Sequence, residues 1–122
     1  MNHSLRPNQR IRGEKNFQLL FKKGKFERGP LLNLWVFSEK AAKTEKPKLG
    51  IIITRKVEPL AVKRNLLRRR IREIFRRSQE RIKPGISVPI QVRSLQETPS
   101  FETIRLELDQ LLARTRSLDE TK

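Results

Sequence analysis

The chain has 122 residues, of which 29 are Lys or Arg and 13 are Asp or Glu, so its formal net charge is +16. This length suits one domain with one modest core, and the clustering of its apolar residues in periodic segments excludes a disordered chain. The absence of cysteine excludes disulfides and thiolate metal sites, and no apolar run approaches the length of a membrane span. We therefore expect a cytoplasmic protein with no membrane partner.

The charge is uneven along the chain. Residues 1–28 hold eight basic and two acidic residues, whereas residues 95–122 hold four basic and six acidic residues. Residues 1–12 contain few apolar groups, which predicts a flexible basic arm that a partner orders. Residues 115–122 are predicted to be a frayed tail. We expect the binding surface in the N-terminal segment and in the basic helix described below.

A short helix is predicted over 14–23. Phe17, Leu20 and Phe21 share one face of it, and Gly24 stands where a helix C-terminus favours a left-handed residue. Two phenylalanines on so short a helix are most often part of the core. Beside basic residues and a sheet they could equally form the floor of a cleft in which bases stack.

Two strands are predicted next. Residues 31–37 alternate, with Asn33, Trp35 and Phe37 on one face and aliphatic residues on the other, as expected for a strand covered on both sides. Residues 48–54 are rich in β-branched side chains. The length of the polar loop between these segments favours an antiparallel hairpin.

The segment 61–77 predicts an amphipathic helix with eight basic residues and one acid, Glu73. At 3.6 residues per turn, the apolar stripe comprises Leu60, Leu67, Ile71, Ile74, Phe75 and Ile82. The opposite side comprises Asn65, Arg68, Arg69, Arg72 and Arg76. A solvated helix face normally mixes charges. Here Glu73 can brace Arg69 and Arg77, and Glu80 can brace Arg76, each four residues away, but neither acid neutralises the centre of the face. A polyanion would relieve the remaining repulsion, so this face predicts nucleic-acid binding.

The end of the chain adds one strand and one helix. Residues 86–92 read as a strand, and Pro89 inside it predicts an edge position or a bulge, because proline cannot donate a ladder hydrogen bond. A final helix opens at Thr98-Pro99, and its apolar face comprises Phe101, Ile104, Leu108, Leu111 and Leu112. The fold class is therefore α+β, a small two-layer sandwich of a mainly antiparallel sheet with three helices, in a single RNA-binding domain over 1–122.

The chain lacks the side chains of a self-sufficient enzyme. It has no Cys, no Tyr and one terminal His, and its acids are scattered beside basic residues. A self-sufficient nuclease is therefore the weakest reading. A ribosomal or other structural RNA-binding protein would show the same charge and a similar fold. A DNA-reading helix is a further alternative, although no helix-turn-helix spacing or dimer zipper supports it.

The segment from Arg64 to Glu73, Arg-Asn-Leu-Leu-Arg-Arg-Arg-Ile-Arg-Glu, resembles the signature helix of the bacterial ribonuclease P protein subunit. The flanking Leu49-Gly50-Ile51, Thr54-Arg55-Lys56 and the helix around Phe17 are similar to that family as well. The resemblance implies a left-handed βαβ crossover, an exception to the usual handedness. It also implies a function as the non-catalytic subunit of an endoribonuclease that removes the 5′ leader from precursor tRNA.

The resemblance assigns roles to particular residues. It implies that the catalytic RNA, with its own Mg²⁺, performs the cleavage, and that the protein binds no cofactor and is monomeric alone. The residues expected to contact the RNA subunit are Arg64, Asn65, Arg68, Arg69, Arg72 and Arg76. Those expected to line the cleft for the precursor's leader are Phe17, Phe21, Trp35, Arg10, Arg12, Arg55 and Lys56.

Overall fold

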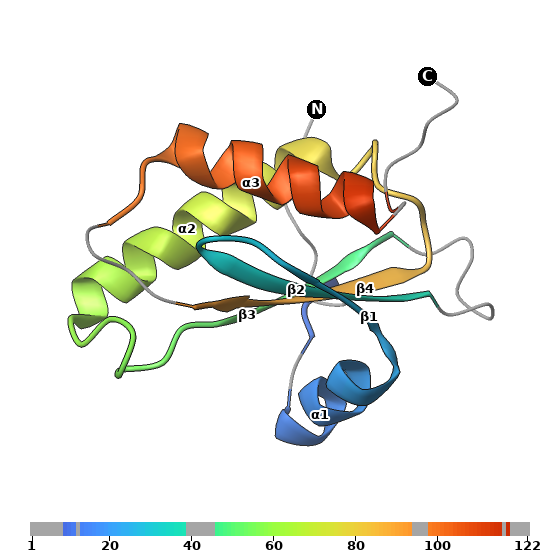
Figure 1. Cartoon of the computed structure of the whole chain (residues 1–122), viewed down its shortest axis with the longest axis horizontal. Helices are drawn as coiled ribbons and strands as arrows, with labels where there is room; N and C mark the ends of the chain where they lie inside the picture. Colours follow the sequence, from blue (N-terminus) through green and yellow to red (C-terminus); the bar gives the residue numbers. More distant parts are fainter. Residues whose placement is uncertain (1–8, 12, 39–45, 94–97, 116, 118–122) are drawn as a thin grey trace.

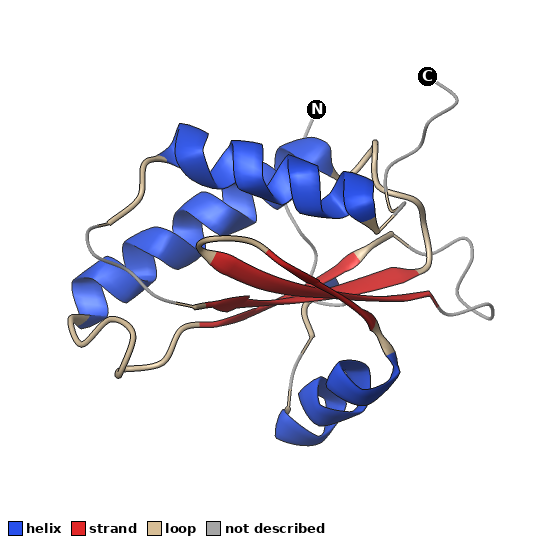
Figure 2. Cartoon of the chain, in the orientation of Figure 1, coloured by secondary structure: helices blue, strands red, loops and turns tan. Residues whose placement is uncertain are grey.

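The computed structural model describes residues 9–11, 13–38, 46–93, 98–115 and 117 (Figure 1). In chain order, the elements of this part are α1 (Glu14–Lys23), β1 (Lys25–Arg28), β2 (Leu32–Ser38), β3 (Lys48–Ile52), α2 (Ala61–Ser78), β4 (Ile86–Val92) and α3 (Phe101–Arg114). The strands form one sheet, with α2 and α3 on one face and α1 on the other (Figure 1, Figure 2). The predicted α+β fold with three helices is confirmed.

The sheet is mixed, with the strand order β1-β2-β4-β3. β1–β2 and β2–β4 are antiparallel, whereas β3–β4 is parallel. The predicted hairpin between the segments 31–37 and 48–54 is wrong, because β4 lies between β2 and β3. A parallel pair needs a crossover connection, and α2 provides it between β3 and β4.

The hairpin of this fold is made by β1 and β2, and β1 escapes prediction from the sequence. Its four residues, Lys-Phe-Glu-Arg, are mostly exposed at the edge of the sheet, so they show no apolar alternation. Phe26 of β1 lies opposite Trp35 of β2. This pairing places two aromatic side chains on the sheet face that α1 covers in part.

Pro89 lies in a central strand, so the predicted edge position is wrong. The pairing of β2 with β4 is interrupted opposite Val88 and Pro89, where the proline has no N–H to donate. The register is the same on both sides of this gap, so no residue is inserted and no bulge forms. On its other side Pro89 pairs with Gly50 of β3.

The core fills the space between the sheet and the helices α2 and α3. Its fully buried side chains include Leu34, Leu67, Ile71, Phe75, Ile90, Ile104, Leu108 and Leu112. The predicted stripes of both long helices are thereby confirmed, apart from Leu60, which is 56% exposed. Leu60 is the N-cap of α2 and has an extended backbone, so it does not share the face of the helix that follows. No helix in the described part of the chain is long and apolar enough to cross a membrane.

Parts of the predicted arm and tail pack against the fold. Gln9 is buried, and its side-chain amide donates to the carbonyl of Pro47 at 3.1 Å and to Oε1 of Gln79 at 3.0 Å. At the other end, Thr115 and Ser117 are buried, and their hydroxyls lie 2.7 Å apart. The tail is therefore not frayed at these two positions. The rest of both predicted segments, apart from residues 10 and 11, lies outside the described residues.

Candidate nucleic-acid interface

One acid braces the C-terminal half of α2. Arg76 donates to the two carboxylate oxygens of Glu73, at 2.7 and 2.5 Å, and Arg77 donates to the same carboxylate at 3.3 Å. The hydrogen bond from Arg76 is the main cause that lowers the pKa of Glu73. The predicted pairing with Arg77 is confirmed, whereas Arg76 takes the place predicted for Arg69.

Two further arginines of α2 bond to backbone carbonyls of neighbouring loops. Arg64 donates at 2.8 Å to the carbonyls of residues 58 and 59, just before the helix. Arg70 donates at 2.5 Å to the carbonyl of Pro99, just before α3. These contacts fix the ends of neighbouring loops, so both guanidinium groups have a structural role whatever else they bind.

The other arginines predicted to face a nucleic acid are Arg68, Arg69 and Arg72, and we call these three the α2 arginine face. Within the residues that the structure describes, none of them forms an ion pair with an acid. Their positive charges therefore remain available to a polyanion.

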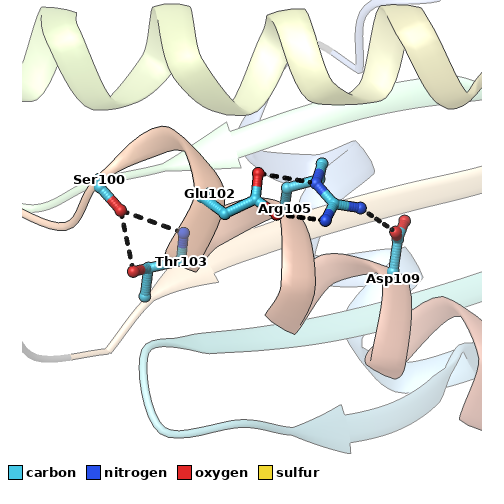
Figure 3. A network of polar contacts seen from close by, with 5 residues as sticks. All are labelled: Ser100, Glu102, Thr103, Arg105 and Asp109. Carbon is cyan, nitrogen blue, oxygen red and sulfur yellow. Dashed lines mark hydrogen bonds and ion pairs between the residues drawn. The ribbon is translucent and has the colours of Figure 1, made fainter.

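Arg105 of α3 provides a contrast (Figure 3). Arg105 lies between Glu102 and Asp109, and it bonds to both carboxylates. Ser100 caps the same helix by accepting a hydrogen bond from the backbone N–H of Thr103 at 3.2 Å. Charges on α3 are thus neutralised locally, as in an ordinary solvated helix, and those of the α2 arginine face are not.

The α2 arginine face borders a pocket of about 160 Å³ at the β3 edge of the sheet, which we call the arginine pocket. Its lining comprises Arg10, Ile11, Leu49, Gly50, Ile51, Arg68 and Arg72. Ile11 donates its backbone N–H to the carbonyl of Leu49 at 2.9 Å, which holds Arg10 beside β3. The pKa of Arg72 is lowered by desolvation first, and then by the charges of Arg10 and Arg68. Arginine stays protonated, so three like charges meet here.

Four aromatic rings form a row on the sheet face that α1 covers, and we call them the aromatic row. The ring centroids of Phe17 and Phe21 are 6.0 Å apart, those of Phe21 and Trp35 are 4.3 Å apart, and those of Trp35 and Phe26 are 5.0 Å apart. Phe17, Phe21 and Trp35 are half-buried, and Phe26 is 47% exposed. Accessible ring surface of this kind can stack with bases of any sequence.

Gly50 joins the arginine pocket to the aromatic row. A Cβ atom at this position would lie 2.6 Å from the ring of Phe17 and 3.0 Å from Ile11. Because glycine has no side chain, the ring of Phe17 can lie directly on β3, at the wall of the pocket that Arg68 and Arg72 line. Gly50 therefore lines the arginine pocket and also lies against the first ring of the aromatic row.

A second glycine positions α1. Gly24 is extended at φ −79°, so the expected left-handed conformation is wrong. A Cβ atom there would lie 2.7 Å from the carbonyl oxygen of Leu20 and 3.3 Å from Cβ of Trp35. Glycine is needed for this close approach, which brings the end of the helix onto β2 and sets Phe21 against Trp35.

Residues 5–116 match the family described as Ribonuclease P. The chain belongs to the ribonuclease P protein family. It is 37% identical over 103 residues to the ribonuclease P protein component of a Picosynechococcus species, covering 84% of this chain and 86% of that protein. It is 31% identical over 113 residues to the ribonuclease P protein component of a Pseudanabaena species, covering 92% and 96%.

Solved structures of the family agree with the fold. The RNase P protein from Thermotoga maritima aligns with a TM-score of 0.74 at 32% identity, covering 86% of this chain and 96% of that one. The RNase P protein from Staphylococcus aureus aligns with a TM-score of 0.79 at 24% identity, covering 90% and 97%. At that identity the second likeness supports the fold alone.

The remaining residues that the family resemblance singled out are more dispersed. Asn65 is exposed on α2, and Arg55 and Lys56 are exposed in the turn that follows β3, where neither lines the arginine pocket. Arg12 lies outside the described residues. The structure thus brings together Arg10, Arg68 and Arg72 in one group, and Phe17, Phe21 and Trp35 in another.

Sequence reasoning missed two members of this surface. Phe26 extends the aromatic row, and the signal for it was an isolated aromatic residue between charged neighbours in an unrecognised edge strand. From the sequence, Gly50 is recognised only as part of a strand. A glycine inside a β-branched run is a known sign of close approach by another group, which here is the ring of Phe17.

Proposed function

We propose that this chain is the protein component of a bacterial ribonuclease P, in which it assists the catalytic RNA in removing the 5′ leader from precursor tRNA. The observation that carries the proposal is that Gly50 lines the arginine pocket and also lies against Phe17 of the aromatic row. Neighbouring sites of these two kinds can hold the phosphates of a folded RNA and the bases of a single strand. Membership of the family supports the same assignment.

The α2 arginine face would contact the RNA subunit, together with Arg64, Asn65 and Arg76. Guanidinium groups suit this role because their planar fork donates two bonds at once to a phosphate. Arg64 and Arg76 are already bonded within the protein, so we assign them smaller contributions than those of Arg68 and Arg72. The charge that the α2 arginine face leaves uncompensated supports this division.

The aromatic row would hold the leader as it emerges beside the arginine pocket. Phe17, Phe21 and Trp35 can each offer a ring surface to a base, and such stacking is worth roughly 1–3 kcal/mol per base. Further phosphate contacts would come from Arg10, Arg12, Arg55 and Lys56. These phosphate contacts weaken steeply as the salt concentration rises.

We assign the cleavage itself to the RNA. Among the residues that the structure describes, no three His, Asp or Glu side chains lie close enough together to hold a metal ion. Mg²⁺ held by the RNA would activate the attacking water and stabilise the leaving oxygen. The protein contributes binding and orientation.

We also propose that the protein alone is monomeric and works in the cytoplasm. Its net charge of +16 opposes association between copies until RNA neutralises it. Its sequence contains no cysteine, which suits a reducing compartment.

The direct test is precursor tRNA cleavage at low Mg²⁺ and moderate salt, with a bacterial ribonuclease P RNA alone and with this protein added. We expect stimulation by the protein and no cleavage when the RNA is left out. Tight RNA binding without stimulation would instead favour a structural RNA-binding role. Cleavage by the protein without RNA would instead indicate a self-sufficient nuclease.

A matched pair of variants tests the α2 arginine face. Arg68→Ala with Arg72→Ala should weaken assembly with the RNA subunit and leave the circular dichroism unchanged, because both side chains lie away from the core. The control is Arg105→Ala with Arg114→Ala, which removes the same charge from α3, where both arginines are paired with acids. Equal RNA affinity for the two variants would contradict the assignment.

A further inference from the structure

A second cavity, of about 420 Å³, lies at the end of the sheet where α1 joins β1, and we call it the lysine pocket. Its lining comprises Lys23, Lys25, Val36, Phe37, Ser38, Lys83, Ile86, Thr115 and Ser117. Three lysines from three separate segments line it, and none of the described lining residues is acidic. Neither the predicted RNA-subunit contacts nor the predicted leader cleft includes any of these residues.

Backbone contacts hold parts of this lining in place. Lys25 lies opposite Val36 in the hairpin of β1 and β2. The backbone N–H of Lys83, in the turn after α2, donates to the carbonyl of Ser117 at 2.8 Å, and Ser117 is 1% exposed. The fold therefore fixes the backbone positions of Lys25 and Lys83, while the exposed side chains of all three lysines can reach a ligand.

The local explanation for basic residues covers only part of the pocket. Lys23 stands in the last turn of α1, where a positive charge is favoured by the helix dipole. Lys25 belongs to an edge strand and Lys83 to a turn, so the dipole of α1 does not account for their convergence. Like charges gathered without an acid in the described lining favour an anionic ligand.

Two lining residues of the lysine pocket are chain neighbours of the aromatic row at its β1 and β2 end, and their side chains point to the opposite face of the sheet. Lys25 immediately precedes Phe26 on β1, and Val36 immediately follows Trp35 on β2. The arginine pocket lies at the other end of the row, beside Phe17. A single strand that stacks along the row and continues past Phe26 would pass around the end of the sheet to the three lysines.

We propose that the lysine pocket binds phosphate groups of the precursor's leader, upstream of the bases that stack on the aromatic row. This inference rests on the proposed function and adds a second phosphate site to it. An ammonium group is a compact charge that carries no base preference, so the site would hold leaders of any sequence. Its effect would depend on leader length, because only a leader that passes the row can reach it.

The test is a triple variant, Lys23→Gln, Lys25→Gln and Lys83→Gln, measured on precursors whose leaders are lengthened one nucleotide at a time. We expect wild-type affinity for the shortest leaders and a loss that appears as a step once the leader is long enough. For the longest leaders, the slope of log affinity against log salt should fall by about 2, or roughly 0.7 for each phosphate that the variant no longer neutralises.

The matched control removes the same charge from exposed residues outside both pockets, by Lys15→Gln, Lys46→Gln and Arg81→Gln. Equal losses of affinity in the two triple variants would overturn the inference. A loss at every leader length would overturn it too, and would indicate that these lysines contact the RNA subunit instead of the leader. Wild-type behaviour at every length would overturn it as well. Stimulation of cleavage by the wild-type protein, measured in parallel, tests the proposed function separately.

Discussion

The substitution Gly50→Ala probes the contact that joins the two halves of the proposed interface. Gly50 lies in β3, in register with Pro89 of β4, and needs no unusual backbone conformation. The added methyl group would lie 2.6 and 2.7 Å from two ring carbons of Phe17 and 3.0 Å from Cβ of Ile11. These separations are shorter than carbon atoms tolerate, so the ring of Phe17 must move off the strand.

The expected cost in stability is small. Overpacking of this kind typically costs about 1–3 kcal/mol, whereas replacing glycine by alanine within a strand recovers roughly 0.5–1 kcal/mol of backbone entropy. Phe17 is half-buried, so its ring has room to relax. We expect a net loss of about 0–2.5 kcal/mol in the free energy of unfolding, measured by chemical denaturation.

The effect on binding should be larger. If the displaced ring loses its stack with one base, affinity for a precursor with a leader falls roughly 5- to 150-fold, which corresponds to 1–3 kcal/mol. Affinity for mature tRNA, which has no leader, should not change. Both affinities can be measured by equilibrium titration of the assembled ribonucleoprotein.

A double-mutant cycle identifies the cause. In a Phe17→Leu background there is no ring to displace, so Gly50→Ala should have little further effect on leader affinity. If Gly50→Ala lowers leader affinity equally in both backgrounds, the loss does not act through Phe17. The reasoning from the geometry at Gly50 would then be refuted.

Two further predictions concern acids. Glu107 is buried, and its carboxylate accepts the backbone N–H groups of Leu31 and Leu32 at 2.9 and 2.6 Å, so Glu107→Ala should lower the free energy of unfolding by about 1–3 kcal/mol; an unchanged denaturation midpoint would contradict this. The pKa of Glu73 is lowered in the folded state, so its ion pairs stabilise the fold above the unfolded pKa, and this contribution is lost as pH falls through the folded pKa. The stability difference between wild type and Glu73→Gln should therefore be present at neutral pH and vanish in acid.

Periodicity predicted the helices well because each long helix carries its own apolar stripe. The stripe of α2 is buried from Leu67 to Phe75, as its spacing requires. Strand pairing was harder to predict, because it depends on which strands the connections allow to meet. Nothing local to β2 or β3 indicates that β4 enters between them, although the long helix that connects β3 to β4 is typical of a parallel pair.

The sequence predicts what kind of partner the interface binds, but it does not predict which arginines come together to bind it. A run of arginines with one acid indicates a polyanion partner without any structure. Only the structure separates Arg76, which bonds to Glu73 within the protein, from Arg68 and Arg72, which line the arginine pocket. The pocket depends on neighbours far away in the sequence, such as Arg10 and Leu49, and helical spacing cannot predict them.

The strand β3 lies at one edge of the sheet. An edge strand with open backbone groups invites pairing with other chains. Here the segment containing Arg10 and Ile11 runs beside β3 in a parallel bridge and covers part of that edge. The segment that protects the edge thus also delivers Arg10 to the arginine pocket, so protection of the sheet and assembly of the proposed RNA site depend on one contact. Replacing Ile11 by proline, which removes the 2.9 Å hydrogen bond to Leu49, should therefore weaken RNA affinity, measured by equilibrium titration, although no charge is removed.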